Sequence, residues 1–185
     1  KDACVSAWPP VLQQKPDVVF MIGDTVYSDN DTDSRKDHKG GEANYWKRYC
    51  DTRSRLSYFY AKDLIPTLAS WDDHDFGANN GNKNFKEKTT TRYLFDLFWQ
   101  GSSGVGSKSG NTYFGKGDLE GYDKSFGVSF SFQTRLMDFY LMDDRSFRDE
   151  HGGQWHWGAN QQEWLLTRLE ERSNQAMLFN GSQFF

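Results

Sequence analysis

ASWDDHDFGANN, residues 69–80, follows a short apolar run at residues 64–68 and places three carboxylates and an imidazole in four consecutive positions, Asp72 to Asp75. Clustered carboxylates repel one another and are costly to desolvate unless a cation or hydrogen bonds compensate them. A strand that ends in such a cluster would present oxygen ligands and an imidazole at a sheet edge, where open α/β sheets bind ligands. A polar loop with a local Asp–His pair is the alternative, but the density of charge favours a functional site.

The composition is that of one folded domain, residues 1–185. Hydrophobic residues make up 36% of the chain and aromatic residues 17%, which is too aromatic for a disordered chain. The net charge of −4 argues against a nucleic-acid binder with a basic face. Two cysteines are too few for a disulfide scaffold, and no apolar run approaches the roughly 20 residues of a membrane span. The sequence shows no signal peptide, and because Lys1 is not a natural start, we expect upstream sequence to have been removed.

Apolar runs predict a series of strands. Residues 18–22 are continuously apolar, as in a strand covered on both faces, and the run ends at Gly23 and Asp24. Residues 126–132 alternate between apolar and small or polar side chains, which predicts a strand with one buried face. Further strands are expected at residues 64–71, 135–142 and 176–179.

Segments with the apolar spacing of helices lie between these strands. A short helix begins at Trp8 with proline near its start, a longer one is expected at residues 43–62, and a third at residues 89–100. Asn160 with Glu163 resembles a capping pair for a fourth helix. The residues expected to be buried on the second helix are Trp46, Tyr49, Leu56 and Tyr60. The order of elements predicts an α/β fold that can include an antiparallel component.

The first strand ends in a Gly-Asp-x-x-Tyr pattern. A carboxylate such as Asp24 at a strand end can bridge two cations because it has two oxygens. Tyr27 has an ordinary pKa near 10, so its phenolate would need a strong neighbouring charge such as ferric iron. Taken alone, an ordinary aromatic side chain packed under the loop is the favoured interpretation of Tyr27.

The acidic cluster and the segment after it offer further candidates. Asp73 would supply a carboxylate for a second cation, and His74 could protonate a leaving alkoxide or stabilise a developing charge. Asn79 offers a neutral oxygen ligand or a substrate contact. Arg145, in the sequence DDRSFR, is a candidate clamp for a phosphate group. A salt bridge to Asp143 or Asp144 is the alternative for this arginine.

Other polar motifs give weaker evidence of a functional site. Residues 29–33 alternate like the start of a calcium loop, but Ser34 replaces the required glycine and Gly40 stands where the bidentate glutamate should be, so an EF-hand is rejected. His38, His151 and His156 have no partners at ligand spacing and are expected to be surface or structural residues.

Three patterns stand in order along the chain: Gly-Asp-x-x-Tyr, Trp-Asp-Asp-His-Asp-x-Gly-x-Asn and Met-Asp-Asp-Arg-Ser-Phe-Arg. Together and in this order, they resemble the PhoD-like (alkaline phosphatase D) metallophosphoesterases. The resemblance implies a four-layer αββα sandwich and a site that holds iron (Fe³⁺) with calcium or another divalent cation. Asp24 would be the bridging ligand, Tyr27 the iron-bound phenolate and Asp73 a further ligand, with His74 beside it near the phosphate. Arg145 falls in the family's Asp-x-Arg segment. The resemblance also implies a secreted, periplasmic or cell-surface protein.

The chain departs from this family in two places. Cys4 lies closer to Asp24 than the family's cysteine ligand would, so that ligand is expected before Lys1. The family's later histidine and aspartate ligands are absent and are expected after Phe185, which makes the chain an incomplete sandwich and its activity alone uncertain.

The leading hypothesis is therefore hydrolysis of phosphate esters, by attack of a metal-bound hydroxide on phosphorus. One alternative is a non-catalytic binding or interaction domain derived from the same fold. Another is a glycosidase that uses paired carboxylates, which would leave Tyr27 and Arg145 without a role.

Overall fold

The computed structural model describes residues 7–29, 41–63, 65–100, 127–150, 156–171 and 174–183. The predictions for Cys4, His38, His151, most of the acidic loop at residues 29–33 and the Ser34 and Gly40 that follow it lie outside these residues. The helices are α1 (Trp8–Gln13), α2 (Glu42–Arg55), the 3₁₀ helix η1 (Ser57–Tyr60), α3 (Asp73–Phe76), α4 (Lys88–Phe95), the π-helix η2 (Asp96–Gln100) and α5 (Ala159–Glu170). The strands are β1 (Val19–Ile22), β2 (Thr67–Ser70), β3 (Phe130–Gln133), β4 (Met137–Leu141) and β5 (Gln175–Phe179).

The strands form two small sheets. In the first, β1 and β2 are parallel, with Val19 opposite Thr67 and Ile22 opposite Ser70. In the second, the order is β3-β4-β5, with β3 antiparallel to β4 and β4 parallel to β5. The α/β prediction with an antiparallel component is therefore confirmed.

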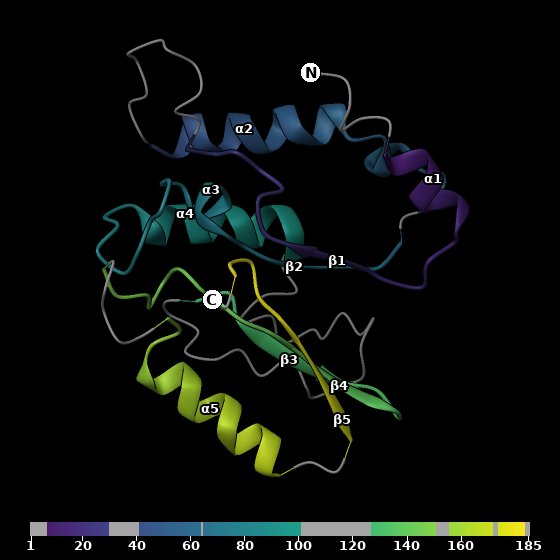
Figure 1. Cartoon of the computed structure of the whole chain (residues 1–185). Coiled ribbons are helices and arrows are strands. Elements are labelled where there is room, and N and C mark those ends of the chain that lie inside the picture. The colour runs from purple at the N-terminus through teal and green to yellow at the C-terminus, as the bar shows by residue number, and fades with distance from the viewer. Residues whose placement is uncertain are drawn as a thin grey trace.

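Four layers stack on one another (Figure 1). Because side chains alternate along a strand, β1 sends Met21 into a core with α2 and α4, and Phe20 into a second core between the two sheets. In the same way β4 sends Leu141 into the core between the sheets and Tyr140 against α5. The predicted αββα arrangement is thus present, in an incomplete form with two-stranded and three-stranded sheets.

The second helix is shorter than predicted. It ends at Arg55, because Leu56 takes an extended conformation (φ −82°, ψ 112°), and η1 follows. Tyr49 is buried as predicted, whereas Tyr60 is 69% exposed. Tyr45 and Tyr58, which were not predicted to be buried, are buried as well. The prediction that Tyr60 belongs to the buried face was wrong because the change from α- to 3₁₀-helix rotates the later side chains.

The capping prediction at Asn160 was also wrong. Helix α5 begins at Ala159, its N-cap is Gly158 with φ +76°, and no side chain of the described residues caps it. Leu165 is buried on its inner face, against Tyr140 and Met142.

Strand ends from both sheets meet at Asp72. A Cβ atom added to Gly23, which has φ +105°, would lie 2.6 Å from Cβ of Asp72, and one added to Gly181 would lie 2.6 Å from the carbonyl oxygen of Trp71. Only glycine fits such close approaches. The segments that follow β1, β2 and β5 are therefore pressed together at one edge of the molecule.

Within the described ranges, none of the helices combines the length and the apolar character that a membrane crossing requires.

Candidate metal centre

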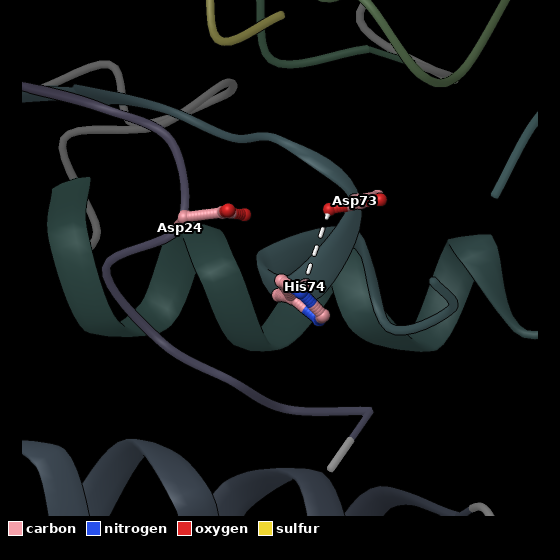
Figure 2. Close-up of side chains that lie close together, drawn as sticks. All are labelled: Asp24, Asp73 and His74. Carbon is pink, nitrogen blue, oxygen red and sulfur yellow. Dashed lines mark ion pairs between the residues drawn. The ribbon is translucent and has the colours of Figure 1, made fainter. Parts of the chain in front are cut away.

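Asp24 reaches this edge from the end of β1. Its backbone has φ +50°, a conformation that non-glycine residues adopt at a cost and that is common at functional sites. One ligand atom each from Asp24, Asp73 and His74 lies within 4.8 Å of the other two, although 49 positions of sequence separate Asp24 from Asp73 (Figure 2). The two strand ends predicted to share a site are thus adjacent.

Asp73 is the first residue of α3 and is buried. Its Oδ2 accepts a hydrogen bond of 2.7 Å from the backbone N–H of Asn80, which itself has φ +54°. One oxygen is therefore fixed by the turn, and Oδ1 lies on the side of the His74 ring.

His74 is oriented by a residue that the sequence analysis did not assign to the site. Its Nδ1 lies 2.7 Å from Oδ2 of Asp29, while its Nε2 lies 4.0 Å from Oδ1 of Asp73. Burial lowers the pKa of His74, but the hydrogen bond to Asp29 and the charges of Asp29, Asp73 and Asp24 outweigh it, so the pKa is raised above its ordinary value. Nε2 is thus the nitrogen available to a ligand.

Tyr27 stacks on this imidazole. The ring centroids are 4.1 Å apart with an interplanar angle of 30°, and the Tyr27 side chain is 48% exposed. Burial, then the charge of Asp24 and the other carboxylates, raises the pKa of Tyr27. A phenolate at this position would therefore require a cation to offset the surrounding carboxylates.

Asp75 holds the centre together from beneath. The side chain is 1% exposed, and it accepts hydrogen bonds from the backbone N–H groups of Val26 (2.7 Å) and Asp72 (3.3 Å). Burial raises its pKa to about 7. This carboxyl joins the loop after β1 to the start of α3, a role that sequence spacing alone does not reveal because Val26 and Asp75 are far apart in the chain.

Arg145 is more deeply buried than a substrate clamp would be. It is 4% exposed, forms an ion pair with Asp72, and donates to Oγ of Ser182 (2.6 Å) and to the carbonyl of Gly81 (3.4 Å). The alternative prediction, that Arg145 forms an ion pair, is therefore confirmed, but its main partner is Asp72. Oδ1 of Asp144 lies 3.8 Å from Nε of Arg145.

Asp143 and Asp144, the two aspartates named in that alternative, contact Arg145 but also have other partners. Asp143 accepts hydrogen bonds from Nε1 of Trp71 and from the backbone of Val128. Asp144 accepts the backbone N–H of Ser182, and burial raises its pKa to about 7.

Asn79 lies exposed on the turn after α3. Of the two neighbouring asparagines, it is Asn80 that contacts the centre, through its backbone. The predicted substrate contact of Asn79 stays a prediction.

The donor set fits a hard cation. Burial and the charges of Asp72 and Asp73 raise the pKa of Asp24. A bound cation would offset the repulsion among these carboxylates. Carboxylate oxygens and an imidazole are also ligands that iron and other transition metals accept.

Comparison with known proteins agrees with this architecture. No protein-family model and no curated protein matches the sequence. A solved structure titled "Structure of PhoD" superimposes on 94% of this chain with a TM-score of 0.60 and 18% sequence identity. The chain has a PhoD-like fold. It spans 38% of the length of that PhoD structure. The shared fold alone therefore does not show that this chain has the activity of the whole protein.

Proposed function

We propose that this chain hydrolyses phosphate esters with the help of bound metal ions. The observation that carries the proposal is the group of Asp24, Asp73 and His74, whose ligand atoms lie within 4.8 Å of one another at two adjoining strand ends. Support comes from the PhoD-like fold and from Arg145, whose Nη2 lies 4.0 Å from Oδ2 of Asp73.

Asp24 and Asp73 would hold the metal, and Tyr27 would join them if the ion is ferric iron. A bound cation would acidify a water molecule and withdraw charge from the phosphoryl oxygens. Iron with calcium or another divalent cation, and a location outside the cytoplasm, belong to the same proposal.

The protein's own groups would complete the reaction. With Nδ1 held by Asp29, Nε2 of His74 would deliver a proton to the departing ester oxygen. Arg145 would hold Asp72 and the strand ends in place and add positive charge 4.0 Å from Oδ2 of Asp73. Asn79, exposed at the rim, would contact the substrate.

The test is release of p-nitrophenol from p-nitrophenyl phosphate and from its bis ester, before and after exhaustive chelation. We expect chelation to abolish turnover, and readdition of Fe³⁺ with Ca²⁺, or of Mn²⁺, to restore it. Equal rates with and without metal would contradict the proposed mechanism. A protein that neither turns over these esters nor gains thermal stability from these metals would favour a non-catalytic binding domain.

A further inference from the structure

A cavity of about 390 Å³ opens where helix α5 begins. This volume lies in the range of roughly 300–1,000 Å³ that pockets for small organic ligands span. Three segments line it: the chain before and at the start of α4 (Lys83 and Lys88), the turn after β4 (Ser146 and Phe147) and the start of α5 (residues 158–160). None of these residues is one of the candidate metal ligands. The cavity is therefore built from a different set of residues than the metal centre.

The first turn of α5 has no side-chain cap. The N–H groups at the start of a helix lack partners within the helix, and together with the helix dipole they favour an anion. The N-cap is Gly158 with φ +76°, and a Cβ atom there would lie 2.7 Å from Cβ of Phe147, so a capping serine or aspartate does not fit. The first turn also contains no acidic residue. The described residues thus supply no side-chain acceptor at the end of α5 that borders the cavity.

A buried hydroxyl is an independent sign of a ligand. Ser146 lines the cavity and is 2% exposed, and its Oγ has no hydrogen-bond partner among the described residues. The backbone at this position is fixed, because the N–H of Ser146 donates to Oδ1 of Asp143 (2.9 Å). A buried hydroxyl without a partner costs stability, and its hydrogen can rotate to meet an acceptor. An anion in the cavity would supply that acceptor.

The described lining carries two ammonium groups and no carboxylate. Nζ of Lys88 donates to the carbonyl of Lys83 (2.7 Å), and Lys83 forms an ion pair with Asp149. An ammonium has three N–H donors, so a lysine can hold a neighbour and an anion together. The carboxylates close in the chain to the lining residues have donors of their own: Asp149 with Lys83, Glu87 with Tyr45 and Glu150 with Asn84.

We propose that this cavity binds a small organic anion. Its carboxylate or phosphate head would lie between the first turn of α5 and the two lysines and would accept the hydroxyl of Ser146, while its apolar body would lie against Phe147. A bare inorganic ion would leave most of the 390 Å³ unfilled. The site is independent of the proposed hydrolysis, because it uses none of the candidate metal ligands.

The first test is isothermal titration calorimetry on the full chain after chelation, so that bound metal does not compete for anions. The probes are phenylphosphonate and benzoate, with inorganic phosphate and benzyl alcohol as controls. We expect saturable binding of at least one of the two aromatic acids, and the tighter one identifies the head group. Each control should bind at least about tenfold more weakly than that acid. Equal affinity for inorganic phosphate would overturn the organic ligand, equal affinity for benzyl alcohol would overturn the anion, and no binding of either acid would overturn the site.

The second test is Asn160→Asp, which adds a carboxylate to the first turn of α5. Because a negative charge at a helix start is favourable, the variant should be at least as stable as wild type in thermal unfolding. It should nevertheless bind the tighter acid at least about tenfold more weakly, by repulsion. The matched control is Gln162→Glu, which adds the same charge at an exposed position of α5 outside the lining and should change affinity less than about threefold. Equal affinity in wild type and Asn160→Asp would place the anion elsewhere.

The third test is Ser146→Ala. Since Oγ has no partner among the described residues, removing it should not lower the melting temperature of the ligand-free chain, but it should weaken binding of the acid about tenfold. A variant that is less stable without ligand, or that binds the acid as tightly as wild type, would show that this hydroxyl does not serve the ligand.

Discussion

At the scale of single residues, the candidate centre depends on side chains that hold other side chains. Asp29 orients His74, Asp75 holds the loop after β1, and Asp72 is the counterion of Arg145. None of the three needs to touch a substrate. Each fixes a group that, in the proposed function, would hold a metal, donate a proton or carry positive charge beside the substrate.

Asp29→Asn tests the first of these roles. An amide is uncharged, so it no longer favours the imidazolium form of His74, and we expect kcat for p-nitrophenyl phosphate to fall about ten- to hundredfold, with a smaller change in KM. Steady-state kinetics give both values. An unchanged kcat in a folded variant would show that the contact with Asp29 has no part in proton delivery.

At the scale of elements, sequence periodicity predicted every strand that the structure describes, but it overestimated the lengths of β1, β2, β3 and β4. The run at residues 18–22 was interpreted as buried on both faces, yet Ile22 is 45% exposed, in a sheet for which the described residues supply two strands, β1 and β2. The end of α2 at Arg55 depends on one backbone dihedral at Leu56, which no apolar pattern encodes. The proximity of Asp24 and Asp73 followed from parallel strands ending at one edge, whereas the partners of Arg145 depend on how two sheets stack.

The close approach of Gly23 to Asp72, where the strand ends meet, gives a prediction at this scale. Gly23→Ala should destabilise the fold by about 2–4 kcal/mol, because alanine is strained at φ +105° and its Cβ would meet Asp72 at 2.6 Å. Gly41→Ala is the matched control, since Gly41 also has positive φ (+119°) but has no atom within 4 Å of the added Cβ. Denaturant unfolding gives both values. Equal losses in the two variants would mean that the close approach at Asp72 contributes nothing.

At the scale of the whole molecule, buried carboxyl groups make stability depend on pH. Burial raises the pKa of Asp96 to about 6, against 3.8 in an unfolded chain, although Arg92 lowers it somewhat. Because the folded state holds this proton more tightly, the contribution of Asp96 is most favourable below about pH 4 and is lost as pH rises through 6. Between pH 5 and pH 8 this loss is about 1 kcal/mol.

Asp96→Asn should remove that part of the slope. The difference in unfolding free energy between pH 5 and pH 8, measured with urea, should become smaller than in wild type by about 1 kcal/mol. Asp96 lies in η2 and is not one of the three residues whose ligand atoms form the candidate centre, so metal binding should not change. An identical slope in the two proteins would mean that Asp96 titrates at its ordinary pKa.

The account depends most on Asp24 and Asp73 binding one cation together. Calorimetric titration of Mn²⁺ into the chelator-treated full chain measures this directly. We expect saturable binding that Asp24→Asn and Asp73→Asn each weaken at least about tenfold, while Asp17→Asn, an exposed carboxylate at the other end of β1, leaves it unchanged. Absence of binding to the wild-type chain, or equal affinity in all four proteins, would contradict the shared site.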